Sequence, residues 1–327
     1  MATYYGTYGQ KVQYLASDPS DPQIGQVWYN STSAVLKVRQ SVATNSWASG
    51  GNMATARYGL GSANAGTQTA GLAFGGDTGT QTNVTEEYNG TSWSPGGNLG
   101  TTRRRLSGAG TQTAGLAFGG YSDTAGSAQS ATEEYDGTSW TAGGSLTTGR
   151  YGLGGCGIQT SALGFGGIPA GNVVNLTEEY DGSSWTSGGN LNTSREGLGG
   201  AGTQTAGLAF GGNLDPGVSS ATESYNGTSW TSVNSLNTAR LSLAGAGSQT
   251  AGLAFGGNIP PVSAATELWN GTSWTSNPSG LATARFSLGG AGTQTAGLAF
   301  GGASPSASAA TEEWTGTETS NRTVTVS

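Results

Sequence analysis

The chain has 327 residues, of which 60 are Gly and 9 are Trp, and its formal net charge is −7. That length suits one large all-β domain or two ordinary domains, and the negative charge gives no attraction to phosphate backbones, so we expect no nucleic-acid partner. We also expect no membrane insertion and no signal peptide, because no apolar run has the length of a span and residues 1–10 lack a basic start followed by an apolar stretch.

Residues 1–40 differ from the rest of the chain in composition, with few Gly-Gly steps. Within them, residues 25–30 are predicted to form a strand, residues 31–33 a turn and residues 34–39 a second strand. We therefore expect a short N-terminal β-hairpin segment that attaches the rest of the chain to a larger assembly.

Residues 41–315 are dominated by an internal repeat. The segment LAFGG occurs five times and LGFGG once, and successive copies of a recurring Trp lie 44 to 47 residues apart. This period is typical of propeller blades, and each unit reads as four short antiparallel strands with tight turns such as Asp136-Gly137. The fold is therefore predicted to be all-β, a six-bladed β-propeller with almost no helix.

The first recurring Trp, Trp47, precedes the first complete unit, whereas the last unit has three strands and no matching Trp after them. The simplest account makes the strand around Trp47 the fourth strand of the last blade, because ring closure removes exposed sheet edges. Residues 316–327 are then spare, and we expect them to add a strand to an outer blade edge or to a neighbouring subunit.

Each unit contains one Arg at a recurring position and one acid that never varies, the first Glu of the TEEY-type strand. Alternation places this Glu on the same face as the aromatic residue two positions later, which makes the Arg its natural partner. We expect six structural pairs, formed by Arg57, Arg103, Arg150, Arg195, Arg240 and Arg285 with Glu86, Glu133, Glu178, Glu223, Glu267 and Glu312. The single cysteine, Cys156, is interpreted as a small buried side chain.

The order FGG, EEYDGTSW and LTTGR resembles the Kelch repeat: Gly-Gly after an apolar strand, an aromatic residue, a Trp and an Arg ten residues later. The resemblance covers residues 44–315. One departure is the short gap between Tyr135 and Trp140, which implies a tighter hairpin than is usual in that family.

The wording of the repeat, AGTQTAGLAFGG with TEEYDGTSW, is similar to that of repeat proteins from marine bacteriophages. Residues 18–40, with G-x-x-W-Y-N and L-K-V, resemble short hairpins near the N-termini of tail-fibre and other virion proteins. The resemblance implies a structural or receptor-binding virion component, located in the virion and made in the host cytoplasm. Residues 1–40 and also 316–327 would then contact other virion proteins.

The loops between second and third strands differ in every unit, whereas the turns at the opposite face hardly change. Because variable loops on a rigid scaffold usually carry binding, we expect a ligand at the loop face. Polar groups with an aromatic suit carbohydrate, so a host surface glycan is the expected ligand. The candidate contact residues are Asp77, Tyr121, Asp123, Asn172, Asn213, Asp215 and Asn258.

The chain contains no His, so Ser-His and Cys-His nucleophile chemistry and ordinary zinc sites are absent. Adjacent acids such as Glu133 and Glu134 point to opposite strand faces and cannot flank one glycosidic bond. We therefore expect no enzyme, no metal and no cofactor. Besides a receptor-binding virion protein, the alternatives are a purely architectural capsid or tail decoration protein and an intracellular Kelch-like interaction module. A carbohydrate-active enzyme is a third class, and the absence of His speaks against it.

Overall fold

The computed structural model describes residues 12–42 and 45–324, and every regular element in that part of the chain is a β-strand. The chain divides into two compact units, one formed by residues 1–45 with 316–327 and the other by residues 46–315. Among the described residues, no helix is long and apolar enough to cross a membrane. The predicted all-β fold class is confirmed.

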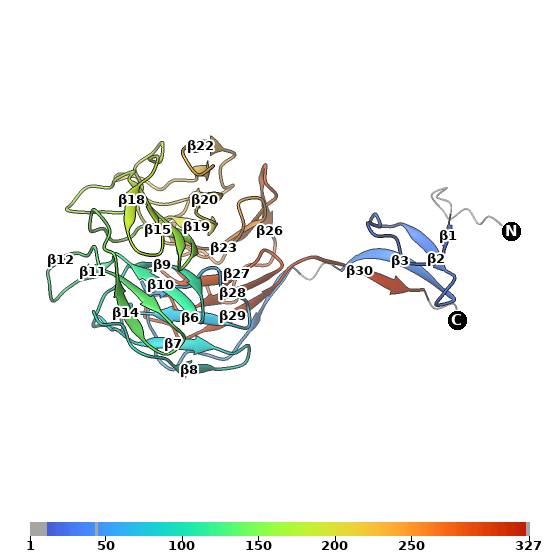
Figure 1. Cartoon of the computed structure of the whole chain (residues 1–327), viewed down its shortest axis with the longest axis horizontal. Helices are drawn as coiled ribbons and strands as arrows, with labels where there is room; N and C mark the ends of the chain where they lie inside the picture. The colour runs from blue at the N-terminus through green and yellow to red at the C-terminus, as the bar shows by residue number, and fades with distance from the viewer. Residues whose placement is uncertain (1–11, 43–44, 325–327) are drawn as a thin grey trace. The chain divides into compact units, whose positions relative to one another are not determined.

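Residues 46–315 form six four-stranded antiparallel sheets, which we number in chain order (Figure 1). Sheet 1 contains β5 (Gly61–Ser62), β6 (Gly71–Phe74), β7 (Thr85–Tyr88) and β8 (Trp93–Pro95). Sheet 2 contains β9 (Ser107–Thr111), β10 (Ala114–Phe118), β13 (Thr132–Tyr135) and β14 (Trp140–Gly143), with a small hairpin, β11 (Tyr121–Ser122) and β12 (Ser127–Ala128), in its loop. Sheet 3 contains β15 (Gly154–Ile158), β16 (Ser161–Phe165), β17 (Thr177–Tyr180) and β18 (Trp185–Ser187).

Sheet 4 contains β19 (Gly199–Gly202), β20 (Gly207–Phe210), β21 (Thr222–Tyr225) and β22 (Trp230–Val233). Sheet 5 contains β23 (Ala244–Gly247), β24 (Gly252–Phe255), β25 (Thr266–Trp269) and β26 (Trp274–Asn277). Sheet 6 contains β27 (Gly289–Gly292), β28 (Ala296–Phe300), β29 (Thr311–Thr315) and, from the other end of the repeat region, β4 (Ser46–Ser49). Trp47 lies opposite Trp314 in this sheet, as the sequence predicted.

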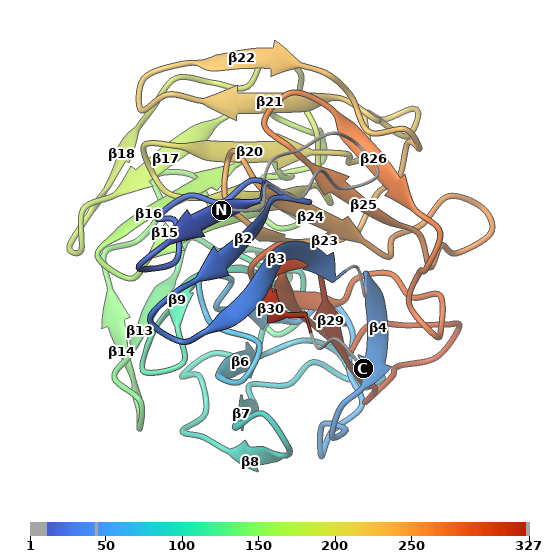
Figure 2. The ribbon, with the colours of Figure 1, turned by 90° about the vertical axis from the view of Figure 1, so that its right-hand side faces the viewer.

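The arrangement of the six sheets is propeller-like, with their strands around a common centre in Figure 2. The first strand of each sheet contacts the first strand of the next, and β27 also contacts β5. Small residues line these strands because side chains of the second strands leave no room. A Cβ added at Gly61 would lie 2.3 Å from the ring of Phe74, and one at Gly108 would lie 2.4 Å from the carbonyl oxygen of Ser62.

Large aromatic side chains fill the space between neighbouring sheets. The Phe of each second strand packs against the Trp of the following sheet, as Phe74 does against Trp140 at a ring-centroid distance of 4.9 Å. Each of these Trp residues donates from its indole nitrogen, at 2.9 Å, to the Thr that begins the third strand of the preceding sheet. The contact between sheets 1 and 6 is of the same kind, since Trp93 donates to Thr311. Cys156 is buried between sheets, as expected, and burial raises the pKa of its thiol to about 12.

All six predicted Arg–Glu ion pairs form, with Nη2 of each Arg 2.7–3.0 Å from a Glu oxygen. The six Arg side chains are buried, and Nη1 of each donates to two backbone carbonyls of its own sheet, such as those of Gly166 and Leu176 for Arg150. Burial lowers the pKa of all six guanidinium groups, to about 10 for Arg57, while the paired Glu opposes that shift. These pairs tie the first, second and third strands of each sheet together.

The second acid of the TEEY-type strand points to the other side of the sheet. Its variability follows from the residue that it meets on the next sheet. In sheets 1–3 and 6 it accepts a hydrogen bond of 2.5–2.6 Å from a tyrosine hydroxyl of the next sheet. In sheets 4 and 5 its place is taken by Ser224 and Leu268, and the next sheet then carries Trp269 or Trp314 instead of Tyr. Each of these Trp residues donates to a backbone carbonyl of its own sheet and needs no acid.

The smaller unit is a four-stranded sheet in the order β1 (Gln13–Leu15), β2 (Val27–Asn30), β3 (Val35–Val42) and β30 (Glu318–Thr323). The predicted hairpin is therefore present, with the β2–β3 pair antiparallel and β1 added in parallel. The expectation for residues 316–327 was wrong, because β30 pairs with β3 rather than with a blade edge or a neighbour. The cause is the length of β3, which continues to Val42 and offers an edge for β30 to cover.

Asp18 explains the W-Y-N motif of this small sheet. Its carboxylate accepts hydrogen bonds from the indole of Trp28 and the amide of Asn30, and it forms a 2.7 Å ion pair with Lys37. Hydrogen bonds from these three groups hold the pKa of Asp18 well below its usual range. The motif residues therefore have a structural role in fixing residue 18 to strands β2 and β3.

Candidate functional site

One end of the six sheets carries the turns between first and second strands, and we call this end the Gln face. The Gln of each turn donates through Nε2 to two backbone carbonyls of the preceding sheet, at 2.5–3.2 Å. Gln159, for example, bonds to the carbonyls of Gly115 and Tyr135. The constancy of these turns therefore has a structural cause, and the contrast with the variable loops does not by itself indicate binding.

The other end carries the loops between second and third strands, and we call it the loop face. The first residue of each loop pairs in a β-bridge with the residue that follows the buried Arg, as Asp77 does with Tyr58. Each sheet thus places two variable positions side by side at the loop face. The residues after the buried Arg are Tyr58, Arg104, Tyr151, Glu196, Leu241 and Phe286.

A closed cycle of six backbone hydrogen bonds surrounds the axis at the loop face. The N–H of one residue per sheet donates to the carbonyl of its counterpart in the preceding sheet, at 2.6–2.8 Å, and the cycle closes from Gly59 to Ser287. All six have positive φ, and three of them are not glycine: Arg105, Ser242 and Ser287 each have a φ of 52°. We call this cycle the collar. Non-glycine residues rarely adopt this conformation, so the collar fixes it by bonding.

A depression of about 300 Å³ lies at the axis of the loop face. Its lining side chains come from the positions after the buried Arg and from the collar, and we call it the axial depression. It is lined by Tyr58, Gly59, Arg104, Arg105, Glu196, Leu241, Ser242, Phe286 and Ser287. Aromatic rings and charged groups thus meet in one concave site, an arrangement found in ligand pockets.

The guanidinium of Arg105 crosses Gly152 to form an ion pair with Glu196, which belongs to sheet 4. It also lies over the ring of Tyr151, 4.9 Å from the ring centroid. The side chain of Arg105 is 36% exposed and that of Glu196 only 8%. The Tyr151 ring and the burial of Glu196 therefore hold this pair in place at the lining of the axial depression.

Three of the predicted contact residues gather around Arg104. Its guanidinium bonds to Asp77 at 2.9 Å and to Asp123 at 3.2 Å, and it lies 5.9 Å from the ring centroid of Tyr121. Gln81 joins the same two loops by donating to the carbonyl of Tyr121 and accepting from the amide of Asp123. These bonds fix the loops of sheets 1 and 2 to one another.

The other four predicted contact residues do not meet. Asn213 donates to Glu196 at 3.3 Å, and Asn258 forms a β-bridge with Leu241. Asn172 and Asp215 are exposed in their loops. None of the seven predicted residues lines the axial depression, although Asp77, Asp123 and Asn213 contact side chains that do.

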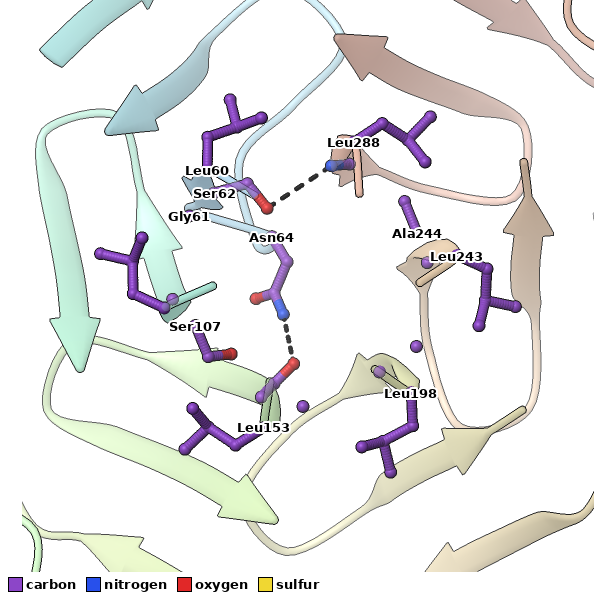
Figure 3. Close-up of a pocket in the computed structure, with 18 residues that line it drawn as sticks. Leu60, Gly61, Ser62, Asn64, Ser107, Leu153, Leu198, Leu243, Ala244 and Leu288 are labelled. Atoms are coloured by element: carbon purple, nitrogen blue, oxygen red, sulfur yellow. Dashed lines mark hydrogen bonds between the residues drawn. The ribbon is translucent and has the colours of Figure 1, made fainter. Parts of the chain in front are cut away.

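The axis below the collar contains a polar cavity of about 120 Å³, lined mainly by glycine and leucine at the first strands (Figure 3). Asn64 reaches across it, and its Nδ2 donates to the carbonyl of Gly155 in sheet 3 at 2.6 Å. Sheet 1 has two more residues than sheet 2 between the strand-one Leu and the turn Gln, Leu60 to Gln68 against Leu106 to Gln112. Counting that interval in each repeat would have identified this insertion from the sequence.

The described residues contain no group of three or more side chains suited to hold a metal ion. Comparison of the chain with protein-family models and with curated proteins gives no match to either.

Proposed function

We propose that the six sheets are the blades of a closed, six-bladed Kelch-like propeller. Four kinds of contact that join sheets 1 to 6 in sequence also join sheet 6 to sheet 1. They are the Trp–Thr bond, the Gln–carbonyl bonds, the collar and the packing of Phe300 against Trp93. A propeller leaves only short, protected sheet edges, which suits a chain rich in short strands.

We propose further that this propeller is a non-enzymatic binding module and that its ligand is a carbohydrate on a host surface. The observation that carries this proposal is the axial depression, where Tyr58 and Phe286 share a concave surface with Arg104, Arg105 and Glu196. Its volume of about 300 Å³ is at the lower end for ligand pockets, which fits a single sugar ring rather than a buried chain.

The place of action that we propose is a phage virion, and this rests on the resemblance of residues 18–40 to virion hairpins. The ends of the chain support a single attachment unit, because β30 completes the same sheet as β1, β2 and β3. That sheet exposes Tyr14 and Ile24, at 70% and 66%, which are available for contact with other virion proteins.

Binding of the purified chain to a glycan array and to host cells tests the functional proposal. The double variant Tyr58→Ala, Phe286→Ala removes the aromatic lining and is expected to weaken binding by at least about tenfold. Exchange of loops 77–84, 121–130 and 213–220 for the loop of another sheet tests the surrounding surface. Thr160→Ala on the Gln face is the matched control, and unfolding midpoints verify that each variant folds.

Retention of host-cell binding by the double variant and by all three loop exchanges would contradict a receptor site at the loop face. A purely architectural role in capsid or tail would then be favoured. Mass spectrometry of purified particles tests the virion role separately: peptides from this chain in the particles support it, and their absence contradicts it.

A further inference from the structure

The charges around the axial depression are unequal. Two guanidinium groups, those of Arg104 and Arg105, meet three carboxylates, those of Asp77, Asp123 and Glu196, which leaves one net negative charge. Both guanidinium groups are already engaged in ion pairs. An anionic ligand would add negative charge beside carboxylates that already outnumber the guanidinium groups, on a chain whose formal net charge is −7.

The Arg105–Glu196 pair offers donors and acceptors side by side. Unused N–H groups of the guanidinium can donate, and unused lone pairs of the carboxylate can accept. A ligand group that binds to both must itself accept and donate. Neighbouring hydroxyls do so, whereas an ionised carboxylate or sulfate ester only accepts. Because Tyr151 supports Arg105 and Glu196 is largely buried, the pair is positioned before a ligand arrives.

The three large uncharged side chains of the lining form an arc, beside the collar hydroxyls of Ser242 and Ser287. Leu241, Phe286 and Tyr58 come from sheets 5, 6 and 1, which follow one another around the axis, whereas the charged residues come from sheets 2 and 4. A ligand in the axial depression therefore meets charged hydrogen-bonding groups on one side and apolar surface on the other. A pyranose ring has this character, with hydroxyls at its rim and C–H groups on its faces.

Resting on the proposed carbohydrate-binding function, we infer that the axial depression selects an uncharged sugar. Neighbouring hydroxyls of the sugar bond to Arg105 and Glu196, and a C–H face packs on Tyr58, Leu241 and Phe286. The same site disfavours the corresponding uronic acid, because its carboxylate would add to the negative charge of Asp77, Asp123 and Glu196. Arg105 and Glu196 are thus specificity-determining residues.

Titration calorimetry of the full chain with a neutral hexose oligosaccharide and with its uronic acid counterpart tests this inference. Wild type is expected to bind the neutral ligand at least about tenfold more tightly. Glu196→Gln keeps the size of the side chain and removes its charge, so it is expected to reduce or reverse that preference. Arg105→Ser is expected to weaken neutral-sugar binding, and Ser suits the site because Ser242 and Ser287 occupy equivalent collar positions with the same φ.

Thr160→Ala is the control that leaves both affinities unchanged. The inference is overturned if wild type binds the uronic acid as tightly as the neutral ligand, or if Glu196→Gln leaves their ratio unaltered. Should Glu196→Gln fail to fold, loss of neutral-sugar binding in Arg105→Ser supports the inference and full retention contradicts it. These outcomes differ from failure of the proposed function, in which neither wild type nor any variant binds a glycan of any charge.

Discussion

Each sheet has one turn between its first and second strands at the Gln face and one loop between its second and third strands at the loop face. The two ends join neighbouring sheets in different ways. At the Gln face, every sheet bonds to its predecessor through a side chain of the turn itself. At the loop face, the bond that every sheet makes to its predecessor comes from the backbone collar, whereas side-chain contacts such as Arg104–Asp77 join particular sheets only. The loop residues can therefore vary from sheet to sheet. The constancy of the Gln-face turns therefore follows from bonding between sheets and does not by itself indicate a binding site.

Replacing Arg150 with Ala should destabilise the protein, because this Arg is one of six buried side chains that recur in every sheet. The change leaves the Glu178 carboxylate and the carbonyls of Gly166 and Leu176 without their buried donor. Loss of one partner of a buried ion pair costs about 3–5 kcal/mol of unfolding free energy. Chemical denaturation measures it, with Tyr151→Leu as the neighbouring control, expected below about 1 kcal/mol because Leu occupies the equivalent position 241. Equal effects from the two variants would contradict a structural role for the Arg.

Replacing Gln159 with Ala should break the Gln face. Two carbonyls, those of Gly115 and Tyr135, then lose their only side-chain donor across the sheet boundary, which is expected to cost about 1–2 kcal/mol. The adjacent and exposed Thr160, changed to Ala, is expected to cost less than about 0.5 kcal/mol. If the two midpoints agree, bonding does not account for the constancy of these turns.

The third strands allow a further test, because equivalent positions on them make two different kinds of hydrogen bond. Tyr180 donates to Glu134 of the preceding sheet at 2.5 Å. At the equivalent position, Trp269 donates to the carbonyl of Gln249, and the preceding sheet has Ser224 in place of the Glu. Tyr180→Trp and Glu134→Leu should each destabilise the protein, and together they should cost about 1 kcal/mol less than their sum. A double-mutant cycle measures this coupling, and strict additivity would show that the two positions are not linked.

A pH titration gives the smallest effect. Burial first, and then the hydrogen bond to Glu134, raise the pKa of Tyr180 to about 12, and Tyr88, Tyr135 and Tyr225 behave alike with their own acids. Because the folded pKa exceeds the unfolded value of about 10, this stabilisation is present below pH 10 and is lost as pH rises towards 12. Denaturation midpoints measured across that window should fall, and less steeply for Tyr180→Phe than for wild type. Identical slopes would contradict the assignment.

The sequence was most informative about contacts inside one sheet. Alternation along TEEY and the repeat period were enough to pair Arg57 with Glu86, and the unpaired Trp47 was enough to predict its place beside β29. Contacts between sheets were missed, because a repeat pattern carries no register between neighbouring units. The axial depression lay outside the prediction for the same reason: Tyr58, Glu196 and Phe286 are far apart in the chain, and only the arrangement of the sheets around a common centre brings them together.

The pairing of β3 with β30 has a consequence for how the molecule opens. Both strands that meet in sheet 6, β4 and β29, continue along the chain into partners of a second antiparallel pair. Separating β4 from β29 therefore leaves their ends tethered, at a high effective concentration for rejoining, as long as β3 and β30 stay together. A tension applied between the chain termini acts on the small sheet before it reaches the β4–β29 pair. Mechanical separation of β4 from β29 therefore requires the β3–β30 pair to separate as well.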